Sequence, residues 1–216
     1  DTANSQAKRP LLLVLPGGDG SADFHPFVKR IYQNALTGDY LVAQLIAPKW
    51  DAGQQIVWPT QKSRVKGQKF TTEQFATAVI DEIRSKYAVD ERRVFTLSWS
   101  SGGPAAYAIS LDANTRVRGS LIAMSVYKPS LLPPLEGAKG QAYFLLHSQQ
   151  DRVCPYAMAR AASLALANKG AATKLVDYDG GHGWRGDVFG NIRQGIEWLE
   201  KNAQAPTTTK SASSSR

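Results

Sequence analysis

Short apolar runs alternate with amphipathic segments along most of the chain. The apolar runs predict strands at residues 11–15, 41–47, 93–98, 118–124, 142–147 and 173–178. The segments between them predict helices at residues 23–35, 71–87, 102–112, 155–168 and 188–201. Strands that alternate with helices are typical of α/β proteins. We therefore expect a mostly parallel central sheet of about six or more strands, with helices on both faces.

Two of the predicted helices show the amphipathic pattern clearly. In the helix at 71–87, Thr71 and Gln74 have the spacing of a capping box, which satisfies free backbone N–H groups where a helix begins. The apolar stripe of this helix consists of Phe75, Val79, Ile83 and Tyr87. The stripe of the last helix consists of Phe189, Ile192, Ile196 and Leu199. Each stripe lies on one side of its helix and predicts packing against the sheet.

The length and composition of the chain fit one folded domain. It has 216 residues, of which 43% are hydrophobic, enough for a substantial core. We assign residues 10–202 to a single α/β domain, residues 1–9 to a polar N-terminal leader and residues 203–216 to a flexible tail rich in Ser and Thr. Because the leader lacks an initiator Met, we expect that a signal peptide or longer N-terminus has been removed. Such processing favours a secreted or periplasmic protein over a cytoplasmic one.

A candidate nucleophile follows the apolar run at 94–97. Residues 98–103 have the sequence SWSSGG, which predicts a strand, a sharp turn and then a helix, as in the nucleophile elbow G-x-S-x-G. If Ser101 were the nucleophile, the bulky Trp99 would occupy a position that needs a small residue. If Ser98 were the nucleophile, larger side chains would replace both glycines. Ser100 leaves only one mild departure from the pattern, and we therefore predict Ser100 as the nucleophile.

An acid and a base follow in the chain order Ser, Asp, His that this elbow requires. Asp151 lies in a loop after the predicted strand at 142–147, and His182 lies between glycines after the strand at 173–178. Loops at the carboxyl ends of parallel strands are where such sheets gather functional groups. Asp177 and Asp179 are rival acids, but both are too near His182 in sequence to occupy a separate loop. We predict Asp151 as the acid and His182 as the base.

Backbone N–H groups that stabilise an oxyanion should come from two loops. One donor is expected from Ser101, directly after the nucleophile. The other is expected from the glycine-rich segment 16–21, which follows the predicted first strand; Gly18 is our choice and Asp19 is its rival. The same segment is also compatible with a tight turn or a phosphate-binding loop. It lacks the remaining spacing of a dinucleotide fingerprint, and no Walker lysine follows it.

Four segments together resemble the small α/β-hydrolases: LPGGDG at 15–20, SWSSGG at 98–103, HSQQDRVCP at 147–155 and GGHG at 180–183. The pattern is most similar to the phospholipase/carboxylesterase and dienelactone-hydrolase-like groups, and it covers residues 10–200. Where those families more often have His-Gly, this chain has Pro16 and Gly17. The resemblance implies an α/β-hydrolase fold. It also implies a triad of Ser100, His182 and Asp151.

The function that follows from these residues is hydrolysis of carboxylic esters by a serine nucleophile through an acyl-enzyme. Residues 125–141, between two predicted strands, are too few for a cap domain. An uncapped site favours short acyl groups, or an ester carried on a polymer. The prolyl-oligopeptidase catalytic domain has similar segments, so peptide hydrolysis is an alternative. A non-catalytic binding module with this fold is a further alternative, although such a module is expected to have lost a triad residue.

Tryptophans and cations near the predicted site suggest how substrate is bound. We expect Trp58, Trp99 and Trp184 to contact substrate, and Trp58 lies in the long segment 48–70, where long loops are usually functional. Trp58 is equally compatible with a buried plug that holds this loop down. The loop carries a run of cations that either meets an anionic substrate or forms a solvated face. These cations are Lys62, Arg64, Lys66 and Lys69.

Several other classes of protein are disfavoured. The net charge of +8 favours anionic surfaces in general, but no nucleic-acid-binding motif accompanies it. No apolar stretch is long enough to span a membrane. The single cysteine, Cys154, excludes an internal disulfide and is expected to pack in the acid loop. The histidines His25, His147 and His182 have no metal-ligand spacing, so neither a metal nor another cofactor is expected. The oligomeric state stays open.

Overall fold

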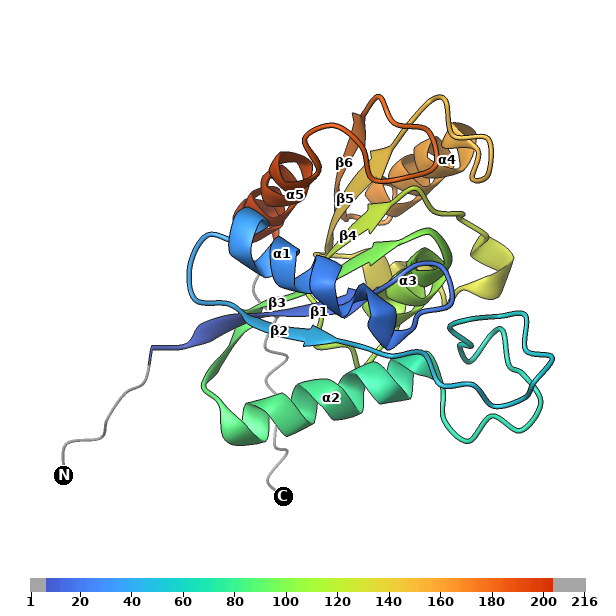
Figure 1. Ribbon diagram of the computed structural model, residues 1–216, viewed down its shortest axis with the longest axis horizontal. Coiled ribbons are helices and arrows are strands. Elements are labelled where there is room, and N and C mark those ends of the chain that lie inside the picture. The colour runs from blue at the N-terminus through green and yellow to red at the C-terminus, as the bar shows by residue number, and fades with distance from the viewer. Residues whose placement is uncertain (1–6, 204–216) are drawn as a thin grey trace, which may run out of the picture.

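A sheet of six parallel strands, in the order β2-β1-β3-β4-β5-β6, forms the centre of the protein in the computed structural model, which describes residues 7–203 (Figure 1). The strands are β1 (Arg9–Leu15), β2 (Leu41–Gln44), β3 (Val89–Trp99), β4 (Gly119–Ala123), β5 (Ala142–His147) and β6 (Ala172–Asp177). The predicted α/β class with a parallel central sheet is confirmed.

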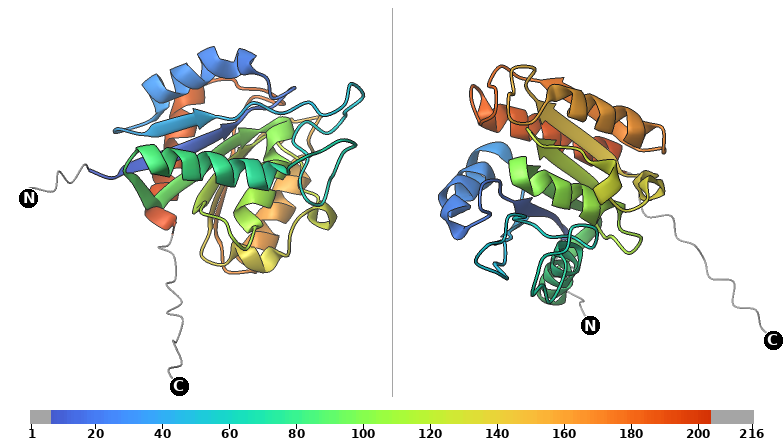
Figure 2. Two further views of the ribbon diagram at one scale, coloured as in Figure 1. Left: turned by 90° about the horizontal axis from the view of Figure 1, so that it is seen from below. Right: turned by 90° about the vertical axis from the view of Figure 1, so that its right-hand side faces the viewer.

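Helices cover both faces of the sheet (Figures 1 and 2). They are α1 (His25–Ala35), α2 (Thr72–Lys86), α3 (Gly103–Leu111), α4 (Tyr156–Ala167) and α5 (Val188–Asn202). On one face, Leu12 and Val14 of β1 belong to a core shared with α1 and α5. On the other face, Leu11 and Leu13 pack with α2 and α3. Because side chains alternate along a strand, the continuous apolar run of β1 serves both layers.

Two strands differ from their predicted bounds for identifiable reasons. β3 begins at Val89, earlier than predicted, because Val89 pairs with Arg9 of β1 although charged residues follow it. Hydrophobic pattern alone does not detect such a segment. β2 ends at Gln44, earlier than predicted, because the chain then leaves the sheet and the Ala47 N–H donates to the Gly20 carbonyl.

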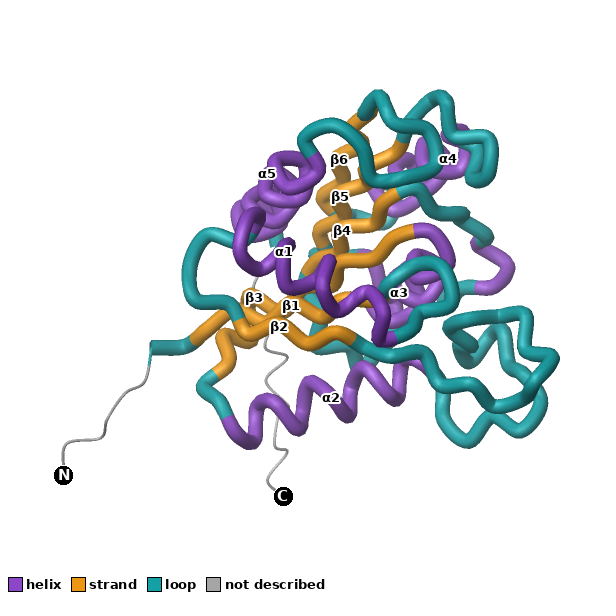
Figure 3. Tube along the Cα trace, in the orientation of Figure 1, coloured by secondary structure: helices purple, strands orange, loops and turns teal. Residues whose placement is uncertain are grey.

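The carboxyl ends of all six parallel strands lie at one edge of the sheet, so the loops after β1, β3, β5 and β6 meet there. Loops gather at this edge in Figure 3, and the long segment between β2 and α2 extends beside them. Between β4 and β5 the chain forms only the short 3₁₀ turns Pro129–Leu131 and Leu135–Ala138. Within the described residues there is no cap domain over this edge.

The predicted leader and tail fall mostly outside the described residues, which exclude 1–6 and 204–216. β1 begins at Arg9, the last residue assigned to the leader. In residues 7–203, no helix has the length and apolar character needed to cross a membrane.

The capping box predicted at Thr71 is present at the start of α2. The Thr71 hydroxyl accepts from the Gln74 N–H at 3.3 Å, and Gln74 Oε1 accepts from the Thr71 N–H at 2.9 Å. We expect Thr71→Ala to lower the free energy of unfolding by about 1 kcal/mol. Thr77→Ala, the same change inside the same helix, should not lower the free energy of unfolding, because alanine is the better helix former. Denaturant unfolding measures both, and equal losses would contradict the capping role.

Candidate active site

Ser100 lies at the point where β3 turns into α3, and its backbone has a φ of +50°. Residues other than glycine rarely adopt this left-handed conformation, so the turn stores strain. Close packing explains the glycines that follow. A Cβ on Gly102 would collide with the Leu15 carbonyl, and a Cβ on Gly103 with the Ser125 hydroxyl. The alternative Ser98 has no exposed surface, which removes it from contact with any substrate.

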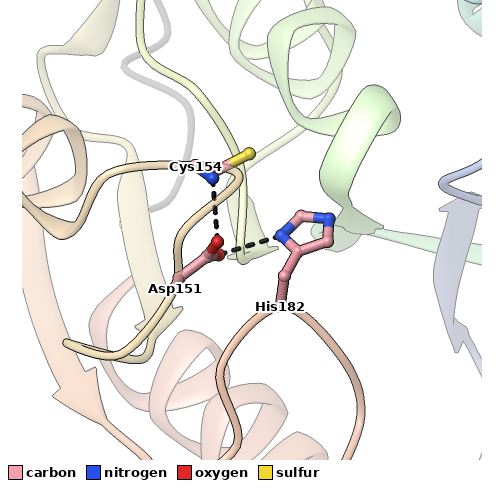
Figure 4. Close-up of side chains that lie close together, drawn as sticks. All are labelled: Asp151, Cys154 and His182. Atoms are coloured by element: carbon pink, nitrogen blue, oxygen red, sulfur yellow. Dashed lines mark hydrogen bonds and ion pairs between the residues drawn. The ribbon is translucent and has the colours of Figure 1, made fainter.

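The three residues predicted as nucleophile, base and acid lie together in a chain of hydrogen bonds. Ser100 Oγ is 3.0 Å from His182 Nε2. His182 Nδ1 is 2.9 Å from Asp151 Oδ2 (Figure 4). The Asp151 side chain is fully buried, whereas the imidazole is 23% exposed. Since an ionised carboxylate accepts only, Nδ1 carries the proton and Nε2 is free to accept from the serine hydroxyl.

Asp151 is held as an anion by its own loop. Its Oδ1 accepts from the backbone N–H groups of Val153 and Cys154, both at 2.8 Å. Burial opposes ionisation, but these N–H groups and the His182 imidazole offset it, so the pKa of Asp151 lies below its ordinary value. Asp151 therefore keeps its negative charge to a lower pH than an ordinary aspartate.

The rival acids have other positions. Asp177 accepts from the Gln149 backbone N–H at 3.1 Å and from the Gln149 amide at 2.6 Å, so it ties the end of β6 to the acid loop. Asp179 is exposed and lines an open cavity. Within residues 7–203, the His182 imidazole forms no hydrogen bond with Asp177 or Asp179.

His147, which the sequence analysis considered only as a metal ligand, supports the acid loop. Its side chain is buried, and Nε2 donates to the Cys154 carbonyl at 2.7 Å. The same nitrogen is 3.4 Å from Asp151 Oδ2. His147 therefore fixes the loop from beneath and places a second N–H near the carboxylate. The only sign of this role in the sequence is that His147 ends an apolar strand.

Tyr178 was also missed, because it was counted only as the end of a strand. Its buried hydroxyl donates to the carbonyl oxygens of Gly181 at 3.0 Å and Gly183 at 2.7 Å. These residues flank His182, so the hydroxyl fixes the loop that carries the imidazole. Burial raises the pKa of Tyr178, which keeps the phenol protonated as the donor that this contact needs.

The glycine-rich loop after β1 lies against the elbow. Ser101 Oγ donates to the Gly18 carbonyl at 2.8 Å, which links the two loops expected to supply oxyanion donors. Gly18 is exposed and has a φ of +60°, and a Cβ there would crowd Phe24. Within residues 7–203, neither the Gly18 N–H nor the Asp19 N–H donates to a backbone acceptor. Both therefore stay available, and the choice between them remains a prediction.

The prediction that Trp58 contacts substrate is wrong. Trp58 is 2% exposed, and its indole N–H donates to the Pro16 carbonyl at 2.9 Å. Its ring packs so closely on Gly20 that a Cβ there would collide with it. Trp58 is thus the plug that anchors the long loop beneath the glycine-rich segment.

Trp99 and Trp184 pack against each other in one aromatic cluster. Trp99 is 5% exposed and makes edge contacts with Phe24, Phe27 and Trp184 at ring distances of 5.5–5.8 Å. Trp184 is half-buried in the same aromatic cluster. The burial of Trp99 corrects its assignment from substrate contact to core packing, whereas a contact of the half-buried Trp184 with substrate stays a prediction.

The cation run in the long loop is exposed, which fits both a solvated face and a site for an anionic substrate. Its four side chains are exposed, and none forms an ion pair with another described residue. They are Lys62, Arg64, Lys66 and Lys69.

Cys154 lies beside Asp151 and His182, with potential metal ligands of all three residues within 4.8 Å of one another (Figure 4). The donor chemistry does not suit a resident metal, because the carboxylate and imidazole are already bonded to each other. Burial and the Asp151 charge raise the pKa of Cys154 to about 11, which disfavours the thiolate that a metal needs. Cys154 therefore packs in the acid loop, with its N–H on Asp151.

No family model matches the chain. Solved structures do. A carboxylesterase from Bacillus cereus is 18% identical, with a TM-score of 0.63 over 90% of this chain and 89% of its own. SOBER1 of Arabidopsis thaliana is 19% identical, with a TM-score of 0.66 over 88% and 99%. The chain has the α/β-hydrolase fold. Esterase 2 of Thermogutta terrifontis, recorded with propionate bound, is another α/β-hydrolase neighbour, 16% identical with a TM-score of 0.64 over 93% and 86%.

The contact of Tyr178 with the His182 loop predicts an effect on turnover. Tyr178→Phe removes only the hydroxyl, and we expect it to lower the free energy of unfolding by about 1 kcal/mol. Because the imidazole is then less firmly placed, kcat should fall about three- to tenfold with little change in KM. Tyr87→Phe, at an exposed tyrosine, is the matched control. If both variants keep full kcat on an activated ester, the hydroxyl does not position His182.

Proposed function

We propose that the protein is a serine hydrolase that cleaves carboxylic esters. The observation that supports this most strongly is the hydrogen-bonded series from Ser100 through His182 to the buried Asp151, placed at the carboxyl edge of the sheet. A serine hydroxyl needs a base to become nucleophilic, and a base needs a group that fixes its tautomer. Both requirements are met here by residues from separate loops.

In the first step, His182 Nε2 takes the proton of Ser100 as Oγ attacks the ester carbonyl. Asp151 keeps the proton on Nδ1 and stabilises the imidazolium that forms. The strained backbone of Ser100 projects the hydroxyl out of the strand, where a carbonyl carbon can approach it. Ser125 Oγ donates to the Ser100 carbonyl at 2.7 Å and supports this conformation.

The tetrahedral intermediate carries a negative charge that needs donors. We assign these to the N–H groups of Ser101 and Gly18, whose loops are linked by the Ser101 hydroxyl. Loss of one such donor typically costs about 2.7–4 kcal/mol of transition-state stabilisation. His182 then gives its proton to the leaving alcohol, and water repeats the sequence on the acyl-enzyme.

The open edge of the sheet favours particular esters. Because only short 3₁₀ turns connect β4 to β5, this connection supplies no cap that encloses a long acyl chain. The substrate in this proposal therefore has a short acyl group or is carried on a polymer. The Thermogutta terrifontis esterase recorded with propionate is an example of a neighbour with a short acyl ligand.

The nucleophile is tested by labelling and by substitution. A fluorophosphonate probe should attach to Ser100, and Ser100→Ala should abolish both labelling and ester hydrolysis while the unfolding curve stays unchanged. p-Nitrophenyl acetate and butyrate should be hydrolysed, whereas chromogenic peptides should not. Label mapped to Ser98 or Ser101, or faster cleavage of peptides than of esters, would contradict the proposal.

The acid is tested by removing one charge at a time. Asp151→Asn should reduce kcat on the order of 10⁴-fold, as the equivalent change does in serine proteases, because the amide favours the wrong tautomer. Asp177→Asn is the matched control, since its carboxylate bonds to Gln149 and not to the imidazole. Loss of turnover in the Asp177 variant with retention in the Asp151 variant would show that the acid is assigned to the wrong residue.

A further inference from the structure

An open cavity of about 760 Å³ lies between the acid loop and the loop that carries His182. Asp151 and His182 form part of its wall. Ser100 does not line it, so the cavity adjoins the imidazole without including the nucleophile. The cavity is large enough for a small polar molecule and is continuous with the base.

Charge is distributed unevenly around this cavity. Arg152 and Arg185 both line it, both are exposed, and neither forms an ion pair with another residue in 7–203. The charge of Asp151 is buried and already matched by its hydrogen bonds. Asp179 is the remaining acid of the wall. The exposed charges of the lining thus sum to one net positive charge.

The position of the cavity indicates which part of an ester it can receive. In the proposed mechanism His182 Nε2 protonates the leaving oxygen, so that oxygen must come within hydrogen-bond reach of the imidazole. The alcohol part of the ester therefore lies on the His182 side of Ser100, while the acyl part stays with the oxyanion donors. A group attached to the alcohol is therefore near the cavity that His182 shares with Arg152 and Arg185.

We infer that the cavity binds the alcohol part of the substrate and prefers alcohols that carry an anionic group, a carboxylate or a phosphate. This inference rests on the proposed function. Guanidinium groups suit such anions because their planar donors match two oxygens at once. Arg152 and Arg185 come from different loops, and both of their positive charges favour an anion in the cavity. The negative charge of Asp179 repels the anion and lowers the affinity of the cavity for it.

Matched esters test this preference. The anionic probe is 4-acetoxyphenylacetate, and the neutral probe is 4-acetoxyphenylacetamide; both have the same acyl group, and a methylene insulates the phenol from the charge. The readout is the ratio of kcat/KM for the anionic probe to that for the neutral probe. The double variant Arg152→Gln/Arg185→Gln should lower this ratio about tenfold, since exposed charge pairs are each worth only a few-fold in water.

Two further variants sharpen the test. Asp179→Asn should raise the ratio about threefold, because it removes the opposing charge. Arg160→Gln removes one positive charge, half of what the double variant removes, from an exposed arginine of α4 that does not line the cavity, and it should leave the ratio unaltered. A fall of about threefold in the Arg160 variant, the effect expected for one charge, would mean that overall charge, not this cavity, attracts the anion.

Additional probes separate the kinds of anion and the two ends of the ester. A phosphonate in place of the carboxylate tests phosphate-like groups, and a larger ratio for it indicates a phosphorylated alcohol. Monophenyl adipate carries its charge on the acyl side. If the arginine variants lower the rate for monophenyl adipate and not for the anionic alcohol, the cavity receives the acyl group and the inference is wrong.

The failure of this inference can be told apart from failure of the proposed function. Labelling of Ser100 and hydrolysis of the neutral probe report on the proposed function alone. If both succeed but the ratio of kcat/KM values is unchanged in the Arg152, Arg185 and Asp179 variants, only the inference is overturned. If neither ester is hydrolysed and Ser100 is not labelled, both fall together.

Discussion

The carboxylate of Asp151 has no exposed surface, and a buried charge is stable only where donors surround it. These donors come from two loops. The N–H groups of Val153 and Cys154 belong to its own loop, and the imidazole of His182 belongs to the loop after β6. The acid loop therefore folds around the charge, and the same charge fixes the imidazole. Because one interaction serves both purposes, the position of the base cannot change without disturbing the loop that holds the acid.

The parallel sheet determines which loops can meet in this way. β5 and β6 are neighbours, and His147 at the end of β5 pairs with Asp177 at the end of β6. Ser100 directly follows β3, and both β4 and β5 lie between β3 and β6, so the His182 loop must reach back across the sheet edge. The Tyr178 hydroxyl stiffens that loop where it leaves β6. The segment after β4 supports the elbow from the other side, through the hydroxyl of Ser125.

The sequence predicted those features that depend on short local patterns. The elbow at Ser100 and the glycines around His182 are recognisable because their turns restrict which residues fit. His147 and Tyr178 could not be recognised, because each lies within or at the end of an apolar strand and acts through contacts with another loop. Trp58 was misassigned for a related reason. Its burial depends on Gly20 and Pro16, which belong to a distant segment.

The two sides of the His182 imidazole lie in different environments, and the proposed reaction needs both. On its Nδ1 side the fully buried Asp151 keeps one tautomer, since no water competes for the hydrogen bond. Its remaining surface is partly exposed and adjoins the open cavity. A two-step hydrolysis requires that the alcohol leave and that water enter beside the base. Full burial of His182 would block this exchange, and full exposure would weaken its bond to Asp151. The intermediate exposure of the imidazole satisfies both conditions without a segment that has to open.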